Sequence, residues 1–243
     1  MNSMALPMNN SPVYHMTVPS SGTEVKFKPF LVKQEKALLL AMQSEDEKVM
    51  VATLKEIIAD CIIGDIVVDE LATFDIEYIF AQLRAKSVGE MIEVIVKCDD
   101  CDDDKAKVKL NINIENINVK MDDAHNKKIE LWDGVGVVMK YPNFSMVSKM
   151  QGIQQKDMTP EQMFDIIVEC MSMIYDTEQT YMIKETPKQE VLDFLDNLTN
   201  DQFQKIQTFF DTMPKLTHEV SYACPVCEKE HTKKLEGLQN FFS

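Results

Sequence analysis

The chain has 243 residues and is acidic, with 40 Asp and Glu against 25 Lys and Arg and a net charge of −15. This length can bury a core in one or two domains, and no apolar run approaches the roughly 20 residues of a membrane helix. Phosphate binding needs clustered basic side chains, so the charge predicts no nucleic-acid partner. With seven glycines, no phosphate-binding loop and no hydrolase or metalloprotease motif, the chain is expected to be no enzyme.

The N-terminal third begins without periodicity and then turns helical. Residues 1–22 are rich in Pro, Ser, Asn and Met and predict an extended arm that orders on a partner. Residues 23–88 predict a helical lobe: a short strand near residue 25, then helices over 31–42, from about residue 47, and over 75–86. Ser44 and Glu47 are spaced as a capping box for the second of these helices.

Two Cys-x-x-Cys pairs are the most informative motif, and each one closes a predicted strand. Tetrahedral zinc prefers soft thiolate ligands, and a turn with two intervening residues aims two of them at one point. Two such hairpins brought together would form a closed zinc-ribbon site. The predicted ligands of this structural Zn²⁺ are Cys98, Cys101, Cys224 and Cys227. The strands beside them are 91–97 and 106–114 for the first pair, and 216–223 and 231–235 for the second.

Other interpretations of the cysteines stay open at this point. A redox pair normally opens a helix, where the dipole lowers a thiol pKa, and neither pair does so. Six cysteines also permit disulfides, but the first 20 residues show no basic or apolar run that would export the chain, which favours a reducing compartment. His231 could replace one thiolate. Cys61 and Cys170 lie on apolar helix faces and are expected to be buried, inert thiols.

The spacing between the pairs is unusual, because 122 residues separate Cys101 from Cys224 (224 − 101 − 1). Closing so long a loop costs about 4–5 kcal/mol of chain entropy, whereas structural zinc contributes roughly 10–16 kcal/mol in small peptides. The ribbon should therefore act as a clasp around an inserted domain. Its halves are residues 89–127 and 214–243, the latter including an apolar tail, and the insertion is 128–213. The acidic run after Cys98 is expected to be a solvated turn.

The insertion is predicted to be a hairpin followed by helices. Strands over 128–132 and 135–141 are joined by Asp133-Gly134, a strong hairpin signal. A helix over 159–175 is apolar around most of its girth, which suits either a core position or a methionine-rich binding surface. Thr/Gln pairs three residues apart predict helix caps at Thr159 with Gln162, Thr186 with Gln189, and Thr199 with Gln202.

The apolar C-terminal tail either packs back on the ribbon or docks into a neighbour, and its candidate partner-binding residues are Leu235, Leu238, Phe241 and Phe242. The fold class expected from all these elements is α+β, with mainly helical lobes joined by a split four-cysteine zinc ribbon and short antiparallel strands.

Four stretches resemble one family: Phe27-Lys-Pro-Phe-Leu-Val-Lys-Gln-Glu-Lys, Leu71-Ala-Thr-Phe-Asp-Ile-Glu-Tyr-Ile-Phe, Leu83-Arg-Ala-Lys-Ser-Val-Gly-Glu, and the region from Met213 through the second cysteine pair to Phe242. They are similar to the baseplate hub and hub-assembly proteins of T-even-like, contractile-tailed bacteriophages. The resemblance implies a late viral protein that is made in the host bacterial cytoplasm and becomes a structural part of the central hub in the virion.

The same resemblance implies partners among hub, wedge or tape-measure proteins, with an oligomer possible within the baseplate, and it brings no catalytic residue. A second reading is a chaperone that holds a hub or tape-measure protein and leaves before the particle is complete.

Overall fold

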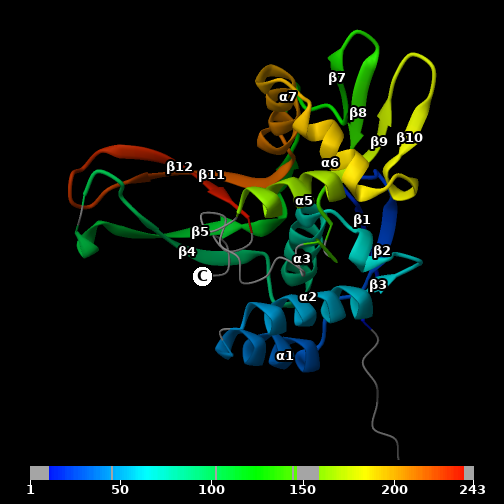
Figure 1. The fold of residues 1–243 in the computed structure, drawn as a ribbon. Helices are drawn as coiled ribbons and strands as arrows, with labels where there is room; N and C mark the ends of the chain where they lie inside the picture. The colour runs from blue at the N-terminus through cyan, green and yellow to red at the C-terminus, as the bar shows by residue number, and fades with distance from the viewer. Residues whose placement is uncertain (1–10, 45, 102, 144, 147–158, 238–243) are drawn as a thin grey trace, which may run out of the picture.

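The computed structural model describes residues 11–44, 46–101, 103–143, 145–146 and 159–237. These residues form twelve strands in four antiparallel sheets, together with six α-helices (Figure 1). The expectation of mainly helical lobes with only short strands is therefore wrong. Four of the strands are seven to nine residues long, and every group of helices packs beside a sheet.

The N-terminal part is a three-stranded sheet beside three helices. Its first strand lies inside the segment expected to be an extended arm, and the Ser20 N–H donates to the buried Asp75 carboxylate at 2.8 Å. Asp46 is the N-cap of the second helix, and its carboxylate accepts from the Lys48 N–H, while Ser44 ends the first helix instead of capping the next. The elements are β1 (Tyr14–Thr17), β2 (Glu24–Phe27), α1 (Val32–Gln43), α2 (Glu47–Cys61), β3 (Ile62–Ile63) and α3 (Thr73–Ser87).

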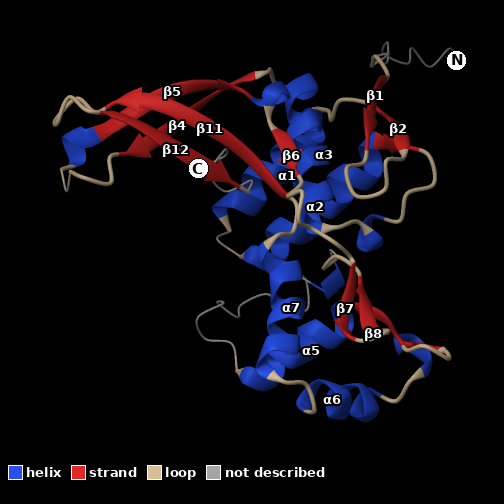
Figure 2. Cartoon of the chain, turned by 90° about the horizontal axis from the view of Figure 1, so that it is seen from above, coloured by secondary structure: helices blue, strands red, loops and turns tan. Residues whose placement is uncertain are grey.

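Two long hairpins pack face to face and form the arm that reaches away from the helices in Figures 1 and 2. Buried and exposed residues alternate along both, the period of a strand with one face in a core. The shared core contains Ile92, Val94, Val96, Ile112, Leu216, Val220, Tyr222 and Leu235. The strands are β4 (Met91–Lys97) with β5 (Lys107–Asn113), and β11 (Lys215–Ala223) with β12 (Glu230–Glu236); β6 (Asn118–Lys120) pairs with the other edge of β11.

The segment between the hairpins contains a four-stranded sheet and three helices. The helix expected over 159–175 ends at Cys170, and Met171–Tyr175 is a strand that pairs with β8. An apolar run of this kind is compatible with either structure, and pairing with β8 decides for the strand. The elements are β7 (Lys128–Trp132), β8 (Val135–Met139), α5 (Pro160–Cys170), β9 (Met171–Tyr175), β10 (Thr180–Met182), α6 (Lys188–Asp196) and α7 (Asn200–Asp211).

Two of the three predicted Thr/Gln capping boxes are confirmed. Thr159 and Gln162 exchange backbone and side-chain hydrogen bonds at the start of α5, and Thr199 with Gln202 does the same at α7. At α6 the residue before the helix is Pro187, which makes no side-chain cap bond. The described residues also contain short 3-10 turns: η1 (Val68–Glu70), η2 (Asp104–Ala106), η3 (Ile114–Asn116) and η5 (Ile183–Glu185).

The largest apolar core lies in the inserted segment, but it also takes Ala72 and Phe74 from the start of α3. Phe74 meets Tyr141 edge-on at 4.8 Å between ring centroids. The insertion therefore shares its core with the N-terminal part, and the proposed domain boundaries stay a prediction. Within the described residues, no helix combines the length and apolar character that crossing a bilayer requires.

Candidate metal centre

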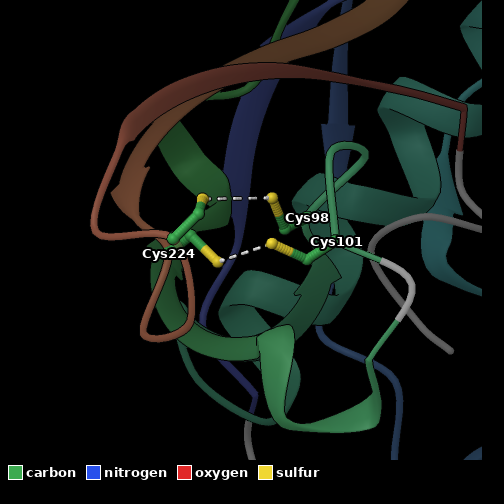
Figure 3. A group of neighbouring side chains, drawn as sticks. Cys98, Cys101 and Cys224 are labelled. Carbon is green, nitrogen blue, oxygen red and sulfur yellow. Dashed lines mark hydrogen bonds between the residues drawn. The ribbon is translucent and has the colours of Figure 1, made fainter.

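The two cysteine turns meet at the outer end of the paired hairpins. The first cysteine turn, residues 98–101, follows β4, and the second, residues 224–227, follows β11. The Sγ atoms of Cys98 and Cys227 are 4.0 Å apart, and those of Cys101 and Cys224 are 3.9 Å apart. All four sulfurs lie within 4.8 Å of one another. Figure 3 shows the two side chains of the first turn pointing toward the second.

This spacing suits a tetrahedral metal ion. Zn–S bonds of about 2.3 Å imply sulfur–sulfur edges of about 3.8 Å in a regular tetrahedron. The same separations are far beyond the roughly 2.05 Å of a disulfide bond, and all six cysteines are free. Cys98 and Cys224 are each 2 % exposed and pack around the fully buried Ala106. The four cysteines thus lie close enough together to bind a metal.

Backbone hydrogen bonds fix the shape of both cysteine turns and do not depend on a bound ion. In the first, the Cys98 N–H donates to the carbonyl of Ala106 at 3.2 Å, which closes the loop between β4 and β5. In the second, the Cys224 N–H donates to Lys229 O, and the Glu228 N–H donates back to Cys224 O, both at 2.9 Å. Glu228 has a φ of 58°, a left-handed conformation that a tight turn requires. Each pair of sulfurs is therefore presented by a closed turn.

The ionisation of the thiols depends on their local surroundings. Backbone N–H groups of Cys227 and Val226 lower the pKa of Cys224 to about 7, and the Val226 N–H lies 3.4 Å from its sulfur. Burial raises the pKa of Cys98 and raises that of Cys101 to about 12. Metals bind thiolates, so Cys98 and Cys101, whose pKa is raised, must lose their protons when a cation binds. The charge of a bound ion would stabilise the deprotonated set.

The acidic first turn is solvated, as expected, and two of its aspartates are also paired with lysines of the second hairpin. Lys233 Nζ lies 2.9 Å from an Asp99 oxygen and donates to Lys97 O at 3.3 Å. Lys229 Nζ lies 3.3 Å from an Asp100 oxygen. Both pairs are exposed to solvent, which screens them, so they orient the turns more than they stabilise the fold. Basic residues beside one Cys-x-x-Cys pair and acidic residues inside the other are the sequence signal for this pairing.

His231 lies beside the sulfur cluster and is not one of its four mutually close members. Its Nε2 is 3.3 Å from Cys98 Sγ and 3.6 Å from Cys227 Sγ. The described residues with ligand atoms all within 4.8 Å of one another are the four cysteines. The structure thus assembles the four predicted sulfurs without a histidine in the place of any of them.

The remaining predicted residues have different fates. Leu235 is 3 % exposed and packs in the core between the hairpins. This agrees with the first of the two expectations for the tail, packing back on the ribbon. Leu238, Phe241 and Phe242 lie outside the described residues, so their docking role stays a prediction. Cys61 and Cys170 are buried in α2 and α5 as expected, and burial raises their thiol pKa to about 11 and about 12.

Comparison with known proteins places these observations in a family. Residues 11–243 match the family model described as T4 bacteriophage base plate protein. Neither a curated protein nor a solved structure matches the chain. The match covers both cysteine turns, the insertion and all the stretches that carried the resemblance in the sequence. The chain belongs to the T4 bacteriophage base plate protein family.

Proposed function

We propose that this protein is a structural component of the central hub of the phage tail baseplate, and that a zinc ion bound by its four clustered cysteines locks the outer end of its paired hairpins. Membership of the family supports a structural role in the virion tail and contact with other baseplate components. The position in the hub and the identity of the metal go beyond that membership. Assembly in the host cytoplasm belongs to the same proposal.

The cysteine geometry is the single observation that carries the metal part of this proposal. Catalytic zinc sites keep one position open for water or substrate, whereas structural sites are closed by four protein ligands. Here four sulfurs surround one point, and they come from two turns 122 residues apart (224 − 101 − 1). A closed site suits a structural role for the ion.

An exposed apolar surface supports contact with further baseplate components. On α1, the outermost helix in Figure 1, Val32 is 78 % exposed, Leu39 55 % and Leu40 57 %. Contiguous exposed apolar residues commonly mark protein–protein contacts. The other proposed contacts are the N-terminal residues before β1 and the C-terminal tail. Hub, wedge or tape-measure proteins are the partners we expect.

Metal analysis of the purified chain tests the zinc site. The wild type should carry one zinc ion per chain, and Cys101→Ser and Cys227→Ser should each lose most of it. Cys61→Ala provides a matched cysteine control, because Cys61 is buried in α2 outside the cluster, and it should keep its zinc. A metal-free wild type, or equal loss in the control, would contradict the site.

Particle composition tests the structural role. We expect the protein in mass spectra of purified virions, and we expect deletion of residues 1–10 or 239–243 to block its incorporation while the chain still folds. The N-terminal deletion must stop before Tyr14, because β1 pairs with β2. A protein needed for tail assembly but absent from finished particles would instead be a chaperone, and the structural proposal would be wrong.

A further inference from the structure

His231 bridges the two cysteine turns from outside the sulfur cluster. Its Nε2 lies 3.3 Å from the sulfur of Cys98 in the first turn and 3.6 Å from that of Cys227 in the second. These are the two sulfurs that face each other across the turns at 4.0 Å. One ring nitrogen is therefore within hydrogen-bond reach of one thiolate from each half of the site.

The position of the ring is set by its neighbours on the hairpin. His231 in β12 is paired with Tyr222 in β11, and the two rings stack with centroids 5.5 Å apart and planes 26° from parallel. The Tyr222 hydroxyl in turn donates to Lys97 O at 3.3 Å, one residue before Cys98. The imidazole is thus held between an aromatic face and the first turn, with Nε2 directed at the sulfurs.

Chemistry assigns the imidazole a donor role. Four thiolates already complete a tetrahedral site, so a further ligand has no vacant position. A thiolate sulfur only accepts hydrogen bonds, so Nε2 must carry the N–H hydrogen in order to donate to it. Four thiolates and a divalent cation carry a net charge of −2, and Asp99 and Asp100 lie beside them. Donors aimed at the sulfurs offset that excess of negative charge.

We propose that His231 is the outer hydrogen-bond donor of this metal site: its Nε2–H donates to the sulfurs of Cys98 and Cys227, ties the two turns together and raises the affinity for the ion. The inference rests on the proposed zinc site and names the residue that governs metal retention there. Groups that hydrogen-bond to metal ligands commonly change metal affinity by about 10–100-fold when they are removed.

The test compares three variants of the full-length chain. His231→Phe keeps a ring for Tyr222 to stack on but removes the donor, and His231→Gln restores an N–H group. His218→Phe is the matched control: the same substitution on the same hairpin, also at a partly exposed position, but opposite Leu235 near the other end of the β11–β12 ladder. Zinc affinity is measured by competition with a chromophoric chelator, and ligand identity by the absorption spectrum of the Co²⁺-substituted protein.

We expect His231→Phe to bind zinc about 10–100-fold more weakly than the wild type, with a cobalt spectrum that still reports four thiolates. His231→Gln should recover most of the affinity, and His218→Phe should match the wild type. Equal affinity in wild type and His231→Phe would overturn the proposal, as would an equal loss in His218→Phe. A cobalt spectrum that changes from three thiolates and a nitrogen to another set would make His231 a ligand instead. A wild type that binds no metal would overturn the zinc site itself, and this proposal with it.

Discussion

Replacing Leu216 with Ala tests what holds the two hairpins together. Leu216 is fully buried near the start of β11, opposite Val119 of β6, and belongs to the core between the hairpins. Leu-to-Ala changes in cores cost about 2–5 kcal/mol, and the cost is largest where the surroundings cannot collapse into the cavity. Both hairpins and α3 contribute to this core, so we expect a loss of about 3–5 kcal/mol.

Urea unfolding of metal-loaded protein measures the effect as a shift in the free energy of unfolding. Leu39→Ala is the matched control, because Leu39 is 55 % exposed on α1 and should cost less than about 1 kcal/mol. Equal losses in the two variants would refute the reasoning. So would a near-wild-type Leu216→Ala, because the metal rather than the apolar core would then hold the hairpins together.

The apolar core between the hairpins reduces the role expected of the metal, which the sequence predicted to join them. Each fully buried aliphatic side chain contributes about 1.5–3 kcal/mol, and several lie between the hairpins. Together they exceed the roughly 4–5 kcal/mol of chain entropy that closing the long loop costs. The hairpins are thus joined along their length by apolar contacts. A bound ion would lock only their outer end.

Three further predictions follow from the same structure. Chelation of metal should accelerate amide hydrogen exchange in residues 98–106 and 224–229 while β4 and β11 stay protected. Loss of protection along the whole hairpins would contradict the conclusion that their apolar core joins them. Burial raises the pKa of Asp75, so its contribution to the free energy of unfolding should be most favourable below the unfolded pKa of about 3.9 and fall as the pH rises through the folded value. Asp75→Asn should remove this term, and a wild type that gains stability over Asp75→Asn between pH 4 and 7 would show the opposite sign. Gly136→Ala should lower the free energy of unfolding by about 1–3 kcal/mol in thermal or urea unfolding, because its Cβ would lie 2.2 Å from Ile129 O and 2.3 Å from the Tyr175 hydroxyl oxygen. An unchanged unfolding midpoint would contradict this prediction and show that the neighbouring atoms move aside without cost.

Local patterns predicted several elements whose signal lies within a few residues, although the caps expected at Ser44 and Thr186 are absent. The alternation in β4 and β5, the Asp133-Gly134 hairpin and the Thr/Gln capping boxes of α5 and α7 all depend on neighbours along the chain. The same kind of evidence failed at Met171–Tyr175. An apolar run there suits a helix or a strand, and β8 is more than 30 residues away in the sequence.

The sequence by itself determined the two cysteine turns, because their chemistry lies in pairs of residues separated by two positions. Membership of a baseplate family could be expected from short stretches for the same reason. Only the tertiary structure decided that the hairpins share an apolar core, that lysines of the second hairpin pair with aspartates of the first turn, and that His231 reaches both turns. Apart from the contact of His231 with Cys227, these contacts join residues more than 100 positions apart, and they form only when packing and antiparallel register bring distant parts of the chain together.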